Sequence, residues 1–204
     1  MKIGPKFKIA KRLNAPIFEK TQTQKFALSQ ARSSGGSNRR RPGQMSDYKR
    51  QLLEKQKLRY SYGLAERQLR RYVDEAMADT KQSPGVALMT RLESRLDNIA
   101  YRLGIAKTRR LARQMVSHGH LSVNGVRSTI PSQHVRVGDI VTVREGSKQS
   151  GLFAQLADTY EAAGVPSWLS FDIKKLSGTV TATPTVTAAD TLFDVDQVLE
   201  FYSR

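Results

Sequence analysis

The chain has 204 residues, no cysteine and a net charge of +16, which comes from 34 Lys and Arg against 18 Asp and Glu. The absence of cysteine excludes disulfides and thiolate metal sites, and no apolar run reaches the ~18 residues that a membrane-spanning helix needs. The basic N-terminus lacks the apolar segment of a secretory signal. The charge excess points to a polyanionic partner, either nucleic acid or an anionic membrane surface.

The charge is unevenly distributed along the chain. Residues 1–75 hold 19 basic and 6 acidic side chains, residues 76–150 hold 12 and 5, and residues 151–204 hold 3 and 7. Apolar residues make up only 39% of the chain. We therefore expect one or two domains with small cores and much surface committed to a partner.

Residues 1–45 show no sustained hydrophobic period, and we expect them to form a basic, loop-like N-terminal arm. The arm is rich in Gly, Ser and Pro toward its end, where Arg39, Arg40 and Arg41 stand together. Phosphate contacts by these three residues would order the arm on an RNA surface.

Two basic helices are expected next, in a helical domain of residues 46–87. Ser46 is the expected N-cap of a helix over 48–62 and Gly63 its C-cap, and an apolar stripe predicts a second helix over about 64–78. A solubilising surface would usually mix both signs of charge, so the excess of bases favours RNA contact. The expected contacts are Lys49, Arg50, Lys55, Lys57, Arg59, Arg67, Arg70 and Arg71.

Residues 88–150 are expected to form a small α+β domain. A break at residues 82–85 precedes one helix over 88–103, in which leucines recur at helical spacing. Short strands are predicted at residues 121–123, 126–130 and 140–144. Strands that follow helices in this order favour the α+β class over a parallel sheet.

The most informative segment is a basic helix that begins after Thr108 and leads into a hairpin at Asn124-Gly125. Its apolar residues fall on one side of the helix, and Arg109, Arg110 and Arg113 fall on the other. Guanidinium groups suit phosphate oxygens, whereas the alternative interpretation is an ordinary solvated basic face. The charge of the whole chain favours phosphate contact.

The last quarter of the chain is acidic and different in character. We expect a connecting helix and loop over residues 151–175 and an extended edge strand or linker over 179–187. Residues 194–202 are expected to form an amphipathic turn or helix. The tail, residues 176–204, is expected to complete the helical domain, because its aromatic residues would otherwise form an exposed patch.

The stretch from Arg91 to Glu145 resembles the small RNA-binding domain shared by many ribosomal and RNA-modifying proteins. The resemblance is carried by Arg-Leu-Asp at 95–97, Thr-Arg-x-x-Ala-Arg-Gln at 108–114, Ser-His-Gly-His at 117–120, Val-Asn-Gly at 123–125 and Gly-Asp at 138–139. The flanks resemble the bacterial type of the fourth protein of the small ribosomal subunit, in the segments 41–44, 46–48, 54–59, 62–68 and 200–204.

That resemblance implies a structural protein of the cytoplasmic ribosome that binds small-subunit rRNA first and nucleates subunit assembly. It also implies a place near the pore through which messenger RNA enters, contact with the fifth protein of the small subunit, an effect on decoding accuracy, and neither membrane partner nor cofactor. The rRNA contacts that it implies are Arg109, Arg113, Gln114, Ser117, His118, His120 and Asn124.

The chain departs from the family's pattern in three places. Some members bind zinc through N-terminal cysteines, which are missing here, so we expect no zinc. The segment between Pro-Gly-Gln and Ser-Asp-Tyr is shorter than usual. Residues 179–189 are rich in Thr where many members are basic, which argues against RNA contact there.

Two alternative functions compete with a ribosomal role. Arg95-Leu96-Asp97 also resembles the catalytic triplet of some pseudouridine synthases, but no large catalytic domain surrounds it, so we expect no enzyme. A free-standing RNA chaperone with the same small domain would not explain the flanking motifs. His118 and His120 lack an evident third ligand, and His134 alone is a weak signal, so no metal site is expected.

Overall fold

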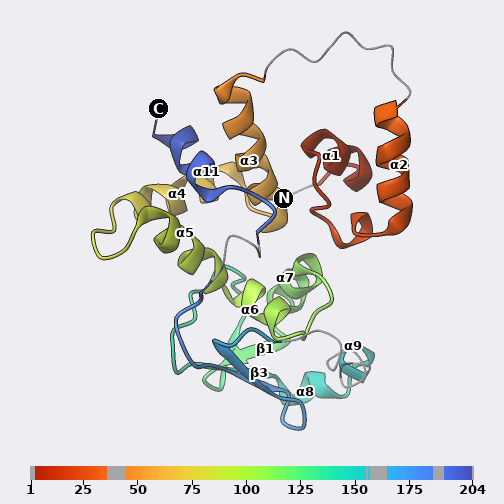
Figure 1. The fold of residues 1–204 in the computed structure, drawn as a ribbon. Helices are drawn as coiled ribbons and strands as arrows, with labels where there is room; N and C mark the ends of the chain where they lie inside the picture. Colours follow the sequence, from red (N-terminus) through yellow and green to blue (C-terminus); the bar gives the residue numbers. More distant parts are fainter. Residues whose placement is uncertain (1–2, 36–44, 155, 157–164, 186–190, 204) are drawn as a thin grey trace. The chain divides into compact units, whose positions relative to one another are not determined.

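The computed structural model describes residues 3–35, 45–154, 156, 165–185 and 191–203. The chain divides into two compact units, and the second unit, residues 88–185, is inserted into the first, residues 1–87 with 186–204 (Figure 1). The first unit is helical where it is described, and the second combines helices with a five-stranded antiparallel sheet. This architecture confirms the α+β class.

The N-terminal segment forms helices where the sequence predicted a loop-like arm. Helix α1 (Lys6–Leu13), the short 3-10 helix η1 (Glu19–Thr21) and helix α2 (Gln24–Gly35) occupy most of residues 6–35. The prediction of a loop is therefore wrong for this part of the arm. Arg39, Arg40 and Arg41 lie outside the described residues.

Packing against a distant helix explains why the N-terminal helices form. Two small apolar clusters hold them, and the ring of Tyr60 in helix α3 (Asp47–Ser61) packs against both. The buried members of the clusters are Ala10, Phe18, Phe26, Leu13, Ala15 and Ile17. These residues are too few to set up a hydrophobic period, so tertiary burial supplies most of the stability of these short helices.

Helices α3, α4 (Glu66–Met77) and α11 (Val195–Tyr202) pack together in the first unit (Figure 1). Ser46 caps α3 by accepting a hydrogen bond from the amide of Lys49, and Asp194 caps α11 through two amides. The C-terminal helix thus packs on the helical unit, as its amphipathic pattern predicted.

The helix predicted over residues 88–103 is interrupted. Helix α5 (Pro84–Glu93) begins with Pro at its first position, and α6 (Leu96–Arg102) begins after Arg95, whose backbone is extended. Arg95 pairs with His134 in an isolated β-bridge, and the amide of Leu96 donates to the carbonyl of Gln133. Pairing with a segment almost 40 residues away breaks the helix, and helical periodicity gives no sign of it.

Helices α6 and α7 (Arg109–Ser117) cover one face of the sheet (Figure 1). Strands β1 (Leu121–Val123) and β2 (Val126–Ser128) form the predicted hairpin, and β3 (Ile140–Val143) pairs with β1. With β4 (Leu169–Asp172) and β5 (Ser177–Val180) they form a sheet in the spatial order β2-β1-β3-β5-β4. Buried side chains between the helices and the sheet include Leu96, Ile99, Leu103, Met115, Leu121 and Trp168.

The acidic part of the chain contributes two strands to this sheet. Strand β5 (Ser177–Val180) lies between β3 and β4 (Leu169–Asp172), so the prediction of an edge strand or linker is wrong for Thr179 and Val180. The tail from 176 onward therefore does not belong wholly to the helical unit. Short helices α8 (Glu145–Lys148) and α9 (Gly151–Ala154) follow β3 in the chain.

Candidate nucleic-acid interface

Helix α7 presents its basic residues because its apolar side is fixed in the core. The hydroxyl of Thr108 accepts a hydrogen bond of 3.1 Å from the amide of Leu111, which makes Thr108 the predicted N-cap. Ala112, Met115 and Val116 are buried against the sheet. The rest of the helix surface is left to Arg109, Arg110, Arg113, Gln114 and Ser117.

Arg113 is held by a buried carboxylate at the start of α6. Its Nε lies 2.9 Å and its Nη2 2.7 Å from Oδ2 of Asp97. Asp97 also accepts hydrogen bonds of 3.0 and 2.8 Å from Nε and Nη2 of Arg95, so one carboxylate binds two guanidinium groups. Asp97 and Arg95 are buried, whereas 29% of the Arg113 side chain remains exposed.

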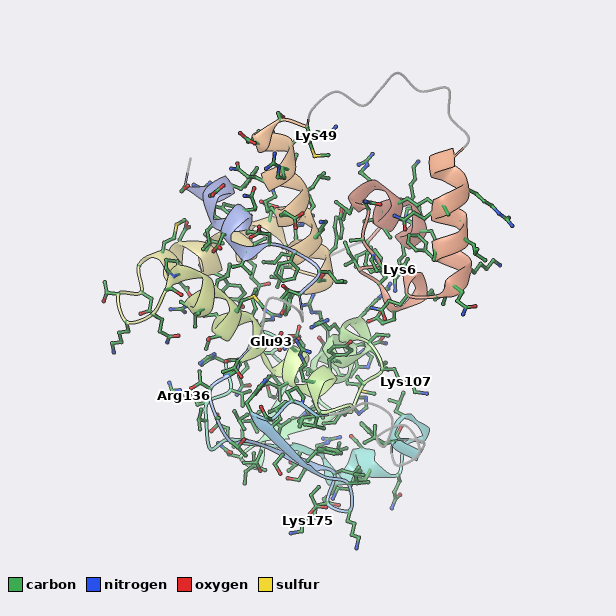
Figure 2. The ribbon with its side chains drawn as sticks, in the orientation of Figure 1. Lys6, Lys49, Glu93, Lys107, Arg136 and Lys175 are labelled. Atoms are coloured by element: carbon green, nitrogen blue, oxygen red, sulfur yellow. The ribbon has the colours of Figure 1, made fainter. Side chains whose placement is uncertain are left out.

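Arg109 is fixed in a comparable way one turn earlier. Its Nε donates to Oδ1 of Asn98 over 2.8 Å, its Nη2 lies 4.0 Å from Glu93, and its guanidinium lies 4.4 Å from the ring centre of Tyr101. Glu93 is fully buried and binds Arg102 through two hydrogen bonds of 2.8 and 2.9 Å. Figure 2 labels Glu93 at the end of α5 and Lys107 in the loop before α7.

The remaining predicted side chains of α7 and of the turn after it are exposed, except that of His120, which is half-buried. Arg110 and Gln114 lie at the surface, and the hydroxyl of Ser117 donates to the carbonyl of Arg113 over 2.9 Å. His118 is exposed and its ring stacks with that of His120 at 6.1 Å between centres. Nδ1 of His120 hydrogen-bonds with Ser147 over 3.0 Å.

Asn124 has a structural role in the hairpin. Its φ of 51° lies in the left-handed region. Its side-chain Nδ2 donates to Asp139 over 2.8 Å, and its Oδ1 accepts from the backbone amide of Ile140 over 2.9 Å. Hydrogen bonds from the amide of Arg136 and from Asn124 hold the pKa of Asp139 below its usual value. An RNA contact by Asn124 would have to share the side chain with these bonds.

The predicted basic residues of α3 fall into exposed and engaged groups. Lys49 and Arg50 are exposed, and Arg50 lies 3.3 Å from Asp47. Lys57 lies 2.6 Å from Glu54 and Arg59 lies 3.3 Å from Glu66, and both are half-buried. Lys55 is not available to a phosphate in this structure, because its ammonium is buried.

Lys55 belongs to a contact that joins α3, α4 and α11. Its Nζ lies 2.8 Å from Glu66 and 4.4 Å from the ring centre of Phe201. The hydroxyl of Tyr202 donates to the same carboxylate over 2.7 Å. Burial alone would raise the pKa of Glu66, but the hydrogen bonds from Lys55 and Tyr202 bring it below its usual value. Burial, followed by the contact with Glu66, raises the pKa of Tyr202.

The three predicted arginines of α4 are exposed. Arg67, Arg70 and Arg71 lie on the helix surface away from the buried stripe of Leu69, Tyr72, Val73 and Ala76. Arg71 pairs with Glu75 at 3.4 Å. Exposed pairs of this kind contribute little stability and leave the cation accessible.

The sequence analysis did not single out Arg127, which lies beside the turn that contains His118 and His120. Its Nη2 donates to the carbonyl of His118 over 3.3 Å. Gly119 has a φ of +73°, and a Cβ there would overlap the guanidinium of Arg127. The missed residue carries no motif of its own, but its register opposite Ser122 in the hairpin places it next to the histidines.

The described part of the chain offers neither a metal site nor a membrane-spanning helix. No group of three or more His, Asp or Glu side chains there could hold a metal ion. None of the helices described is long and apolar enough to cross a membrane.

The second unit is an RNA-binding domain of a known class. The family model described as the S4 domain matches residues 94–141, and the model described as the ribosomal protein S4/S9 N-terminal domain matches residues 1–93. Together they cover both sides of the boundary between the two units.

Named relatives extend the match to nearly the whole chain. The chain is 42% identical over 206 residues to the small ribosomal subunit protein uS4 of Chromobacterium violaceum and to that of Burkholderia ambifaria, with 99% of this chain and 98% of each relative covered. It is 46% identical over 167 residues to that of Dehalococcoides mccartyi, with 80% of this chain and 79% of the relative covered. The chain therefore belongs to the uS4 family of small-subunit ribosomal proteins, which are structural components of the ribosome in the bacterial cytoplasm.

Proposed function

We propose that the protein is a primary binder of small-subunit rRNA and nucleates assembly of the subunit. The observation that carries the proposal is the ordered pair Arg109 and Arg113 on α7, beside the exposed Arg110. Cations displace counterions from RNA and supply most of the affinity, and a rigid arrangement of them favours a particular folded RNA.

The proposed rRNA surface of the second unit includes the turn after α7. Its members are Arg109, Arg110, Arg113, Gln114, Ser117, His118, His120, Asn124 and Arg127. In the first unit the proposed rRNA surface comprises Lys49, Arg50, Lys57, Arg59, Arg67, Arg70 and Arg71. The arginine triplet 39–41, outside the described residues, remains part of the proposal because of its charge.

A binding experiment tests the claim of primary binding. The purified protein is mixed with protein-free small-subunit rRNA in the absence of other ribosomal proteins, and stoichiometry is measured. One protein bound per rRNA supports the proposal. Binding that requires other ribosomal proteins to be present first would contradict it.

Family resemblance supports two finer proposals about the assembled subunit. We expect contact with the fifth protein of the small subunit and a place near the pore through which messenger RNA enters, with an effect on decoding accuracy. Crosslinking in purified small subunits tests both, because it should recover the fifth protein and messenger RNA. Crosslinks to neither would contradict these two proposals.

An enzymatic role in RNA modification is not part of the proposal. Asp97, in the triplet that resembles that of pseudouridine synthases, is 4% exposed and binds two arginines, so it is poorly placed to attack a base. The relatives are named as ribosomal proteins. Conversion of uridine in rRNA during incubation with the protein would contradict this part of the account.

A further inference from the structure

Two buried carboxylates lie directly behind the arginines of α7. Glu93 is fully buried at the end of α5, and Asp97 is 4% exposed in the first turn of α6. Each binds a second arginine through two hydrogen bonds, Arg102 in the first case and Arg95 in the second. A buried carboxylate is costly unless it is paired in this way.

The same carboxylates fix the guanidiniums that face outward. Asp97 binds Nε and Nη2 of Arg113 directly. Glu93 accepts a hydrogen bond of 2.7 Å from the side-chain amide Nδ2 of Asn98, whose Oδ1 in turn accepts a hydrogen bond from Nε of Arg109. Arg109 is thus held between Asn98 on one side and the ring of Tyr101 on another.

The arrangement has two opposite consequences for RNA binding. Negative charge close to the surface weakens the long-range attraction of any polyanion. Side chains that are ordered before binding, however, lose less conformational entropy on binding. The effect is large for arginine, because its long side chain has many rotamers. An exposed arginine without such support keeps its full charge but presents no fixed geometry.

We propose that Glu93 and Asp97 are positioning residues for RNA recognition, which orient Arg109 and Arg113. They lower the general attraction of the surface for polyanions and raise its selectivity for a particular folded RNA. This inference rests on the proposed function of the surface as an rRNA site. It goes beyond that function in assigning the selectivity to two residues that RNA does not touch.

The substitution Asp97→Asn separates positioning from simple charge. The variant gains one positive charge, so electrostatics alone would strengthen binding to every RNA. Positioning predicts that affinity for the 5′ domain of small-subunit rRNA falls by on the order of tenfold, since a charged hydrogen bond is lost, while affinity for bulk tRNA stays the same or rises.

The matched control is Asp172→Asn in β4. It makes the same change of charge in the same unit, at a side chain that is 46% exposed. We expect it to change affinity for both RNAs by the same factor. Thermal unfolding of each variant establishes that the fold is retained.

A second pair of variants avoids the risk that Asp97→Asn fails to fold. Arg113→Lys keeps the charge and the buried carboxylate but removes the forked guanidinium. Positioning predicts a loss on the order of tenfold for the rRNA domain with little change for tRNA. Arg136→Lys, at an exposed arginine of the same unit that lies outside the proposed surface, should leave both affinities nearly unchanged.

The outcomes separate the inference from the proposed function. Selective loss of rRNA affinity in Asp97→Asn or Arg113→Lys supports positioning. Equal changes for both RNAs in Asp97→Asn, with the fold intact, would overturn it. Binding of the rRNA domain by Arg113→Lys that is no weaker than binding by Arg136→Lys would overturn it as well. An unmodified protein that shows no preference for the rRNA domain would instead refute the proposed function.

Discussion

At the scale of single residues, the candidate surface depends on side chains that support other side chains. The sequence shows that Arg113 is a cation, but the hydrogen bond to Asp97 sets the direction of its guanidinium group. Gly119 is a second example, because its positive φ and its lack of a Cβ make room for Arg127. Residue identity in the motif therefore encodes geometry as well as charge.

Substitution Gly119→Ala should destabilise the second unit by about 1–2 kcal/mol, since an L-residue is strained at this φ. It should also displace Arg127 and weaken rRNA binding. Urea unfolding and an affinity measurement check the two effects. Gly146→Ala in α8, where a Cβ meets nothing closer than 4.0 Å, is the control. Equal stability of the two variants would contradict the prediction.

Replacement of Arg113 by Ala should weaken rRNA binding by roughly 1–3 kcal/mol at low salt, because a charge-assisted contact is removed. Lys175→Ala, at the β4–β5 turn (Figure 2), removes the same charge from the second unit and should cost little. Unchanged affinity of the Arg113 variant would remove this residue from the proposed surface.

The hairpin should lose stability in acid through Asp139. Its pKa is lowered in the folded protein, so its contribution is fully present above about pH 4 and is lost as the pH falls through the folded pKa. The stability difference between the unmodified protein and Asp139→Asn should therefore be larger at pH 7 than at pH 3. Urea unfolding at both values checks this, and an equal difference at both would contradict it.

At the scale of elements, the sequence predicts best what short-range chemistry determines. Thr108 and Ser46 are N-caps as predicted, and the Asn-Gly hairpin forms between β1 and β2. The N-terminal helices were missed because burial against Tyr60, not periodicity, stabilises them. The break at Arg95 and the interior position of β5 were missed because both follow from pairing with distant segments.

In the candidate surface too, local spacing could be predicted from the sequence, whereas contacts between distant segments could not. Spacing on a helical wheel placed Arg109, Arg110 and Arg113 away from the core. It did not reveal which of them binds an acid, nor that Lys55 is buried, because the partners of Lys55 lie 11 residues away in α4 and on the C-terminal helix. Pairing of charges across elements is a tertiary property.

Glu66→Gln should destabilise the first unit by about 1–2 kcal/mol, because it leaves the buried Lys55 without its counter-charge. Glu75→Gln, on the same helix, removes the charge from an exposed pair with Arg71 and should cost much less. Urea unfolding at pH 7 compares them. An equal cost for both variants would contradict a special role of Glu66.

At the scale of the whole molecule, the count of 34 Lys and Arg overstates the number of cations that a polyanion meets. Many basic side chains are engaged in the fold, including Lys55, Arg95 and Arg102. The acidic residues that pair with them lie mostly within the first 150 residues, while the acidic end of the chain adds strands and a helix that complete both units. Selective RNA binding then depends on where the remaining cations are held.

The most direct test of the account is a salt titration of affinity for the 5′ domain of small-subunit rRNA, with bulk tRNA as competitor. We predict a steep fall of affinity with salt, together with a preference for the rRNA domain of at least about 100-fold throughout. A fall of equal steepness without preference would contradict the account, since it would describe a protein that coats any RNA.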